Sequence, residues 1–441
     1  MKLTVIGCGY LGATHAACMA ELGHDVLGMD ADLGKVQLLN SGRAPFFEPG
    51  LDDLLVKHTA SGRLKFTASY AEAAQFGDLH FIGVGTPQQA DGDAYDLSHL
   101  FSAVVRRLAA HLKGPAVVAV KSTVPVGTAP RIAEILGEFA PAGEKVEVAW
   151  NPEFLRESCA IEDTLRPDRL VLGFDSEQSW GEAVLRECFA EIIEAGTPTI
   201  VTDWATAELA KASANSFLAT KISFINAVAE VCESAGADVH QLAEILGHDV
   251  RIGRSGMRPG LGFGGGCLPK DLRGFMARAD ELGVDQAVAF LREVDAINRR
   301  RRERMVALAR EQLGGDLAGR RITVWGAAFK PNTDDIRDSP ALAVAQKLHD
   351  LGASVTVTDP KALDNARKVH PELGYVDDPV AAAQGADLLL HLTEWPEFSH
   401  VDPEQLARRV ADAKVIDGRG TLDVEVWRAA GWTVRVLGRA S

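Results

Sequence analysis

The chain has 441 residues, of which 46% are hydrophobic and 24% are charged, and its formal net charge is −15 at pH 7. These values are typical of a globular protein of two or three domains. Such an acidic chain is unsuited to binding nucleic acid or an anionic membrane, although a local basic pocket can still hold an anionic ligand.

The six cysteines form no Cys-x-x-Cys pair and no metal-ligand spacing with histidine, so we expect neither disulfides nor a metal site. Met1 is followed directly by an apolar strand without a basic leader segment. No apolar run reaches the roughly 18 to 20 residues that a membrane span needs. We therefore expect a cytoplasmic protein with no membrane partner.

The first elements predict a dinucleotide-binding unit. A short apolar strand over residues 2–6 precedes the turn Gly7-Cys8-Gly9-Tyr10-Leu11-Gly12, and a helix follows over residues 13–22. This order of strand, turn and helix makes a GxGxxG pattern informative. A second strand over residues 25–29 ends at Asp30, where such folds place the carboxylate that binds the adenosine ribose. Because a carboxylate there would repel a 2′-phosphate, the sequence predicts NAD rather than NADP.

More units of the same kind follow. Strands over residues 79–84 and 116–120 lead into turns that contain Thr86 and Thr123, and we expect both turns to be walls of the cofactor site. A strand over residues 146–150 leads into Asn151-Pro152-Glu153-Phe154-Leu155-Arg156-Glu157. If this segment is helical after Pro152, both glutamates share one face. The alternative is a charge-rich helix start in solvent.

One long helix is predicted from about Ala205 to Ala235, because the stretch lacks proline and interior glycine. Lys211 and Asn215 are one turn apart, so both can point into one pocket. The alternative is that they are merely exposed polar positions. The small residues of this helix would allow close packing with a second subunit, so we expect a homodimer or a higher homo-oligomer.

Two arginine-rich segments follow. Residues 251–259 hold three arginines in a glycine-bearing loop, which predicts a diphosphate clamp or, alternatively, a charged surface loop. Residues 298–304 hold five arginines, and we expect them to form a solvated helix face.

Between these segments lies the stretch Gly260-Leu-Gly-Phe-Gly-Gly-Gly-Cys-Leu-Pro-Lys-Asp271. Its consecutive glycines, residues 264–266, allow a ligand to approach the main chain closely. A helix that opens near Pro269, together with Lys270, could favour the thiolate of Cys267. Read alone, the pattern also fits a buried structural cysteine beside a flexible turn.

A second nucleotide-type fold begins with a strand at about residue 320 and ends after a strand at residues 415–416. Its first turn, at Gly326, lacks the full glycine fingerprint. We therefore expect an α/β protein with two Rossmann-like doubly wound domains joined by a helical middle domain that contains one long central helix. The expected boundaries are 1–204, 205–318 and 319–441.

The whole chain resembles the UDP-glucose/GDP-mannose dehydrogenases, and most closely their UDP-glucose branch. Seven motifs in order carry this resemblance, namely the Gly7–Gly12 turn, Lys121–Thr128, Asn151–Glu157, Glu208–Asn226, Phe263–Asp271, Phe329–Arg337 and Asp417-Gly418-Arg419. The Arg251-Ile252-Gly253 segment and Lys270-Asp271 favour UDP-glucose over UDP-N-acetylmannosamine. GDP-mannose stays an alternative substrate.

The resemblance implies a four-electron oxidation that uses two NAD and one water. The implied catalytic residues are Cys267 as nucleophile, Lys211, Asn215 and Asp271 around an ordered water, and Glu153 as base with the help of Thr123. The implied NAD-binding residues are Gly7, Gly9, Tyr10, Leu11, Gly12, Asp30, Lys35, Thr86, Thr123, Glu157 and Arg337. The implied UDP-sugar-binding residues are Glu153, Phe154, Leu155, Lys211, Asn215, Arg251, Ser255, Gly256, Met257, Arg258, Gly264, Lys330 and Arg419.

Three positions depart from the family pattern. Gly266 stands where serine is usual, Ser158-Cys159 replaces Gly-Ser/Thr, and Gly256 replaces a bulky residue. We expect Gly266 to be tolerated, because glycine supplies the same backbone amide, and Gly256 to weaken the contact of its loop with the nucleotide.

Two other functions stay open. A two-electron hydroxy-acid dehydrogenase would leave Cys267 and the C-terminal fold without a role. A catalytically silent protein that senses NAD or a UDP-sugar would bind its ligands without turnover.

Overall fold

The computed structural model describes residues 1–90, 92–176 and 178–439. It divides into two compact units, of which the first comprises residues 1–214 and 273–283 and the second comprises residues 215–272 and 284–441. The long helix α10 (Trp204–Ala235) and the helix α12 (Leu268–Glu281) each contribute to both units. The three-domain division expected from the sequence stays a prediction.

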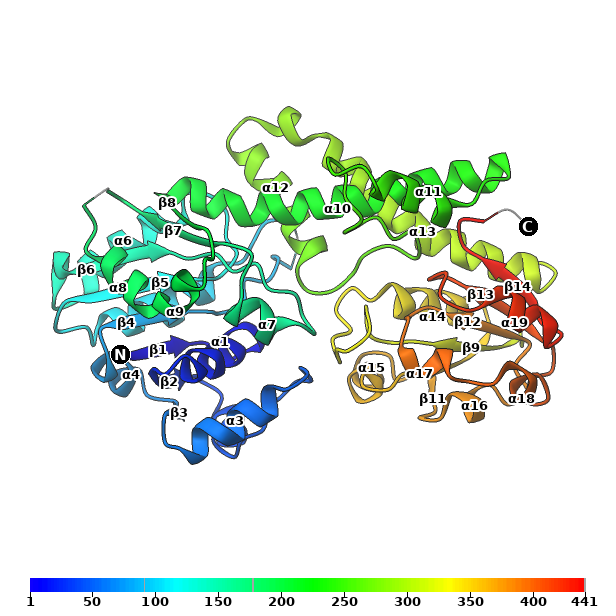
Figure 1. Ribbon diagram of the computed structural model, residues 1–441, viewed down its shortest axis with the longest axis horizontal. Coiled ribbons are helices and arrows are strands. Elements are labelled where there is room, and N and C mark those ends of the chain that lie inside the picture. Colours follow the sequence, from blue (N-terminus) through cyan, green and yellow to red (C-terminus); the bar gives the residue numbers. More distant parts are fainter. Residues whose placement is uncertain (91, 177, 440–441) are drawn as a thin grey trace. The chain divides into compact units, whose positions relative to one another are not determined.

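The first unit is built on an eight-stranded sheet in the order β3-β2-β1-β4-β5-β6-β7-β8, drawn in blue to green in Figure 1. All neighbouring strands are parallel except β6 and β7. The strands are β1 (Lys2–Ile6), β2 (Asp25–Met29), β3 (Leu64–Thr67), β4 (Leu79–Ile82), β5 (Ala116–Val120), β6 (Val146–Trp150), β7 (Leu170–Phe174) and β8 (Thr199–Asp203).

Helices connect these strands and cover the sheet. They are α1 (Tyr10–Glu21), α2 (Leu33–Asn40), α3 (Leu51–Ala60), α4 (Tyr70–Phe76), the π-helix η1 (His99–Val105), α5 (Arg106–Ala109), α6 (Thr128–Phe139), the 3₁₀ turn η2 (Gly143–Lys145), α7 (Ala160–Leu165), α8 (Gly181–Cys188) and α9 (Ala190–Glu194). Apolar cores lie on both faces of the sheet, and β5 is buried at every position. The strands of a parallel sheet that is covered on both faces must be apolar on both sides.

The second unit contains a six-stranded parallel sheet in the order β11-β10-β9-β12-β13-β14, drawn in yellow to red in Figure 1. Its strands are β9 (Arg321–Trp325), β10 (Ser354–Thr358), β11 (Gly374–Tyr375), β12 (Leu388–His391), β13 (Lys414–Asp417) and β14 (Thr433–Val436). Its further helices are α11 (Val239–Gly247), η3 (Asp285–Val288), α13 (Phe290–Gln312), α14 (Pro340–Asp350), α15 (Leu363–Val369), α16 (Pro379–Ala382), α17 (Pro396–Ser399), α18 (Pro403–Ala407) and α19 (Val424–Ala429).

The first turns of the two sheets repeat one hydrogen-bond pattern. In the first unit the N–H of Cys8 donates to Asp30 Oδ2 over 2.9 Å, and in the second the N–H of Ala327 donates to Asp359 Oδ2 over 2.7 Å. Asp359 also accepts from Ala328 and from the indole N–H of Trp395, and it is only 3% exposed. Asp359 is thus the counterpart of Asp30 in the second unit, and it is held by two backbone amides and an indole.

One sequence-based expectation is wrong and another holds only in part. The segment after Pro152 is not helical, because the next helix, α7, begins only at Ala160. The arginine-rich stretch of α13 is only partly a solvated face, because Arg299 and Arg300 are exposed whereas Asn298 is 1% and Arg301 0% exposed. A run of one residue type does not show which side of a helix faces the core, whereas the packing of α13 on α14 and β13 does.

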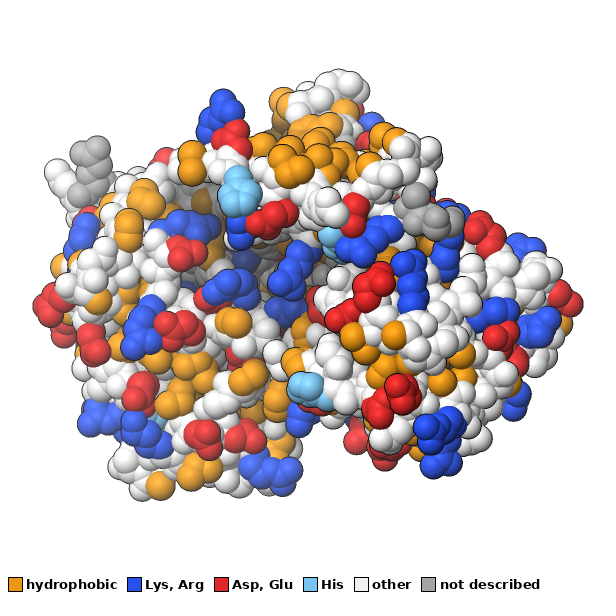
Figure 2. Space-filling model, turned by 45° about the vertical axis from the view of Figure 1, so that its right-hand side comes forward, with side chains coloured by type: hydrophobic (Ala, Val, Ile, Leu, Met, Phe, Trp, Pro, Cys, Tyr) orange, Lys and Arg blue, Asp and Glu red, His pale blue; other side chains and the backbone are white. Residues whose placement is uncertain are grey.

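Charged side chains of both signs intermix over the face of the protein in Figure 2, without a continuous basic stripe on that face. Among the described residues, no helix is long and apolar enough to cross a membrane. Within the same residues, no group of three His, Cys, Asp or Glu side chains is placed to hold a metal ion.

Candidate active site

The glycine turn of the first unit fits a dinucleotide. Gly7 has a φ of +88°, which L side chains rarely adopt, and a Cβ at Gly12 would overlap the carbonyl oxygen of Gly7. Nothing lies within 4 Å of a Cβ added at Gly9. The turn is therefore tight on its inner side and open at Gly9, which is the arrangement that lets a pyrophosphate approach the backbone.

The carboxylate expected to bind ribose lies beside this turn. Asp30 Oδ2 is 2.9 Å from Lys35 Nζ, and the two side chains are 12% and 27% exposed. A carboxylate can accept hydrogen bonds from ribose hydroxyls and an ammonium can bind a phosphate, so the pair fits the predicted roles, which stay predictions. The structure thus brings Asp30, Lys35 and the Gly7–Gly12 turn together, as the sequence predicts.

The two threonine turns meet at the ends of β4 and β5. The hydroxyl of Thr86 donates to the backbone oxygen of Thr123 over 2.6 Å. Beside them Lys121 is buried, and its Nζ donates to Asn151 Oδ1 over 2.8 Å. Burial lowers the pKa of Lys121 to about 8, against an opposing effect of Glu153. Lys121 lies in the Lys121–Thr128 motif, but the sequence alone predicts no role for its side chain.

The loop after β6 carries the first candidate base. Glu153 Oε1 is 3.1 Å from Lys211 Nζ of α10, and both side chains are largely buried. The second oxygen of Glu153 accepts from the N–H of Leu155 over 2.6 Å. The ring of Phe154 lies 5.7 Å from Lys211 Nζ. Lys211 is therefore a buried cation paired with the candidate base, not an exposed polar position.

A buried carboxylate that the sequence analysis did not single out anchors this loop. Glu48 accepts hydrogen bonds from the N–H groups of Ser158 and Ala160 over 2.7 and 2.8 Å, and also from the hydroxyl of Tyr10. Ser158 has a φ of +70°, which explains why glycine suits its position. Because Tyr10 belongs to the glycine turn, Glu48 ties the segment that contains Glu157 to the cofactor turn.

The cysteine loop lies in the second unit. Cys267 is exposed and directly precedes α12, and its carbonyl accepts the first helical hydrogen bond, from the N–H of Asp271 over 2.8 Å. The positive end of the helix dipole therefore lies at the thiol, as expected, and favours the thiolate. Lys270 does not provide an uncompensated charge, because its Nζ lies 2.6 Å from Asp271 Oδ1.

Asp271 is the centre of a buried network. It is 0% exposed, and its Oδ2 accepts from Asn215 Nδ2 of α10 over 2.6 Å. The structure thus brings Asn215 and Asp271 together, and it keeps Lys211 and Asn215 one turn apart on one continuous helix. An amide and a carboxylate held in this way can orient a water or a hydroxyl group.

The glycines before the cysteine make room for the segment that precedes α14. A Cβ at Gly264 would overlap the backbone oxygen of Asp338, one at Gly265 would lie 2.9 Å from the Phe329 ring, and one at Gly266 would overlap the guanidinium of Arg337. The N–H of Gly265 also donates to the carbonyl of Arg337 over 2.8 Å. These glycines are thus required by close packing within the protein, in addition to any approach of a ligand.

The predicted diphosphate clamp is not assembled. Arg251 is exposed and lies 2.5 Å from Asp249, and Arg254 lies 2.5 Å from Glu244. Gly256 has a φ of +76°, with the side chain of Lys221 3.6 Å from a Cβ added there. Of the remaining members of this loop, Met257 is buried whereas Ser255 and Arg258 are exposed. Two of the three arginines of this loop are engaged with local acids, and the role of the loop toward a diphosphate stays a prediction.

Two candidate substrate-binding residues, Arg419 and Lys330, lie in the C-terminal fold. Arg419 Nε donates to the carbonyl of Leu392 over 2.7 Å, and its other nitrogens lie 3.5 Å from Gly262 O and 3.3 Å from Phe329 O. Arg419 therefore lies beside the cysteine loop within the second unit, although far from it in sequence. Lys330 Nζ lies 5.6 Å from the ring of Phe329.

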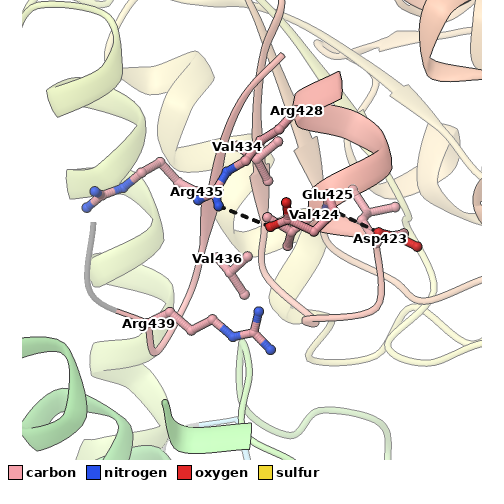
Figure 3. Close-up of a pocket in the computed structure, with 9 residues that line it drawn as sticks. Asp423, Val424, Glu425, Arg428, Val434, Arg435, Val436 and Arg439 are labelled. Carbon is pink, nitrogen blue, oxygen red and sulfur yellow. Dashed lines mark hydrogen bonds and ion pairs between the residues drawn. The ribbon is translucent and has the colours of Figure 1, made fainter. Parts of the chain in front are cut away.

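A separate cavity of about 340 Å³ lies at β14 and α19, as Figure 3 shows. Arg428 and Arg439 line it, but Arg428 lies 3.4 Å from Glu425 and Arg439 lies 3.0 Å from Asp238. No predicted site residue lines this cavity. Two of the three arginines that line the cavity are thus paired with acidic neighbours.

The fold and these residues define a class of protein: a dinucleotide-binding oxidoreductase with a second nucleotide-type domain and an exposed cysteine at a helix start. Three family models match the chain. They are the NAD binding domain (residues 1–193), the central domain (residues 205–300) and the UDP binding domain (residues 323–424) of the UDP-glucose/GDP-mannose dehydrogenase family. The chain belongs to this family.

Individual relatives agree. A UDP-glucose 6-dehydrogenase of Rhizobium meliloti is 42% identical over 100% of both chains, and one of Pseudomonas aeruginosa is 39% identical over 100% of this chain and 98% of its own. The structure of a UDP-glucose dehydrogenase from Pyrobaculum islandicum superposes with a TM-score of 0.90 at 38% identity, and covers 100% of this chain and 98% of its own. A UDP-D-ManNAc dehydrogenase from Pyrococcus horikoshii gives 0.85 at 27%, with 100% and 99% covered.

The family resemblance and the fold class predicted from the sequence are thus confirmed, and the cofactor of the first domain is NAD. The roles assigned to single residues stay predictions.

Proposed function

We propose that this chain catalyses the NAD-dependent four-electron oxidation of UDP-glucose to UDP-glucuronate. The observation that carries the proposal is Cys267, an exposed thiol at the start of α12. Oxidation of an alcohol to an aldehyde needs no nucleophile, whereas oxidation of an aldehyde to an acid gains from a covalent one. The curated relatives with the UDP-glucose 6-dehydrogenase name, similar over their full length, support this substrate.

The first oxidation removes a proton from the C6 hydroxyl and a hydride from C6, which leaves an aldehyde. Bound NAD supplies the hydride acceptor in both oxidations. Asn215 and Asp271 orient the water that takes the proton, because their side chains are already joined in a buried hydrogen bond. The ammonium of Lys211 stabilises negative charge on the sugar oxygen.

The second oxidation proceeds on Cys267. The thiolate adds to the aldehyde carbon, and the oxygen takes up a proton, which gives a thiohemiacetal. Loss of a hydride from this carbon and of a proton from its hydroxyl then gives a thioester. The start of α12 favours the thiolate that begins this step.

Hydrolysis completes the cycle. A water adds to the thioester carbon and loses its proton to Glu153, after which the C–S bond breaks and the proton returns to the Cys267 sulfur. Glu153 keeps one oxygen on the Leu155 amide and the other near Lys211, so this carboxylate is held in place for the reaction. Thr123 assists by orienting the water.

The experiment that tests this function counts NADH formed per UDP-glucose consumed, with GDP-mannose and UDP-N-acetylmannosamine as comparison substrates. We expect two NADH per UDP-glucose, and no acid product from a Cys267→Ser variant. If only another nucleotide sugar gave two NADH per molecule consumed, that sugar would be the substrate and the mechanism would be unchanged. One NADH per substrate, with turnover little changed in Cys267→Ser, would favour a two-electron enzyme of another kind, and binding without turnover would favour a sensor.

We also propose that two copies of this chain associate through α10. Phe217, Phe224 and Val231 repeat every seven residues and are 65%, 53% and 65% exposed, so they form an apolar stripe along one side of the helix. Light scattering should give the mass of a dimer or a multiple of it, and a Phe224→Glu variant should shift the mass toward the monomer. An unshifted mass would exclude this stripe as the interface between the copies.

We expect the protein in the cytoplasm.

A further inference from the structure

The inward face of α13 carries polar side chains that the chemistry described above does not use. Asn298 and Arg301 are 1% and 0% exposed, and the side chain of Arg302 is 17% exposed. In the same stretch, the side chains of Arg299 and Arg300 are 60% and 44% exposed. One helix thus presents two polar faces, one toward the protein and one toward solvent.

Asn298 holds the main chain of the cysteine loop. Its Oδ1 accepts from the N–H of Phe263 over 2.8 Å, and its Nδ2 donates to the carbonyl of Phe263 over 2.9 Å. One carboxamide therefore satisfies both backbone groups of a single residue, as a neighbouring strand would. Gly262, at a φ of +94°, allows this approach, because a Cβ there would overlap Asn298 Oδ1.

The arginines of the same face bind adjacent groups. Arg302 Nη2 lies 3.3 Å from the carbonyl of Phe263, and its Nη1 donates to Asp338 Oδ1 over 2.8 Å. Arg301 Nε donates to the carbonyl of Gly260 over 3.1 Å. Gly260 and Phe263 are thus bonded by three side chains of α13, those of Asn298, Arg301 and Arg302.

These bonds are needed for two physical reasons. Residues 260–263 belong to no helix or strand, yet Leu261 is 0% and Phe263 6% exposed, so their amides and carbonyls must find partners inside the protein. A glycine-rich segment also has unusually many conformations to lose when it is fixed. Side chains from a rigid helix can supply both the partners and the constraint.

We propose that Asn298 and Arg302 are positioning residues that fix the loop through Phe263 and thereby hold the thiol of Cys267 in its reactive geometry. This inference rests on the proposed function of Cys267. A nucleophile must approach its carbon within a narrow range of distance and angle, and a misplacement of about 1 Å can cost about 100-fold in rate. Because Cys267 acts only in the second oxidation, loss of this control slows the second hydride transfer selectively.

The test compares Asn298→Asp with a control, Arg300→Ala, in which an exposed arginine of the same helix is removed. Asn298→Asp keeps the size of the side chain but replaces the Nδ2 donor by an oxygen, so the carbonyl of Phe263 loses a donor and faces a negative charge. With enzyme in excess over UDP-glucose, we expect the first NADH to form within threefold of the wild-type rate. The second should form about 100-fold more slowly.

A second readout needs no substrate. Iodoacetamide alkylates exposed thiols, and mass spectrometry of the Cys267 peptide separates its reaction from that of the other exposed thiol, Cys159. The alkylation rate of Cys267 should change at least fivefold in Asn298→Asp and stay unchanged in Arg300→Ala. Arg302→Lys keeps a charge but loses the two-armed contact, and it should show the same selective effect in weaker form. It serves as the test variant if Asn298→Asp does not fold.

The outcomes separate the two proposals. Equal slowing of both NADH phases, or phases and alkylation rates that match the control, would overturn the positioning role. If the wild-type protein gives no NADH with any of the three nucleotide sugars, the proposed function fails. In that case the alkylation rates still decide whether α13 controls the thiol.

Discussion

Replacing Gly266 by serine tests whether this chain uses the space before its cysteine for Arg337. A Cβ at Gly266 would overlap the Arg337 guanidinium, which Asp335 holds through contacts of 2.9 Å to Nε and 2.6 Å to Nη2. The backbone at Gly266 lies outside the left-handed region, so serine can adopt it. The guanidinium must therefore move, so we expect the substitution to disturb whatever Arg337 binds, whereas the sequence alone predicts that either residue is tolerated here.

The expected magnitude follows from the exposure of the contact. The side chain of Arg337 is 61% exposed, so loss of its pair with Asp335 should cost at most about 1 kcal/mol of unfolding free energy. If Arg337 also holds the NAD pyrophosphate, loss of that charged hydrogen bond costs about 1.5 to 3 kcal/mol. This corresponds to a rise of about 10- to 100-fold in the KM for NAD. The kcat should change little.

The assay is a double-mutant cycle on the KM for NAD with Gly266→Ser, Arg337→Ala and the combined variant. The control is Gly137→Ser, at a position where an added Cβ meets nothing within 4 Å. If serine acts by displacing Arg337, the combined variant should be no worse than Arg337→Ala. Additive effects, or a Gly266→Ser variant that matches the control, would refute the reasoning, as would a large gain in turnover.

Two further predictions concern buried groups of the first unit. Glu48→Gln should lose about 2 kcal/mol of unfolding free energy, because Ser158 and Ala160 lose a charged acceptor. It should also raise the KM for NAD, because Glu48 holds Tyr10 and the segment of Glu157. Unchanged denaturation and kinetics would contradict this. For Lys121→Met, the quantity to measure is the unfolding free energy of the variant minus that of the wild type, by urea unfolding. This difference should be about 2.5 kcal/mol more favourable to the variant at pH 7 than at pH 10. The unfolded lysine keeps its proton to about pH 10.5, whereas the folded one loses it near 8, so wild-type stability rises over this interval; a pH-independent difference would refute the shift.

The sequence alone determined the order and class of the elements. Alternating apolar strands and helices specify parallel sheets, and the glycine turn followed by Asp30 specifies the cofactor end of the first sheet. These signals are local, because they depend on the hydrophobic period and on residues close together in the chain. For the same reason the start of the helix after Cys267 was predictable from Pro269 and its neighbours.

Only the tertiary structure decided which polar groups are buried together. Glu48 lies 110 residues from its partner Ser158, and Asn298 lies 35 residues from Phe263, so neither pairing leaves a local pattern. The five arginines of residues 298–304 are chemically alike, and packing alone determines that Arg301 is buried while Arg300 is in solvent. Burial depends on contacts between distant segments, and a single sequence does not contain those contacts explicitly.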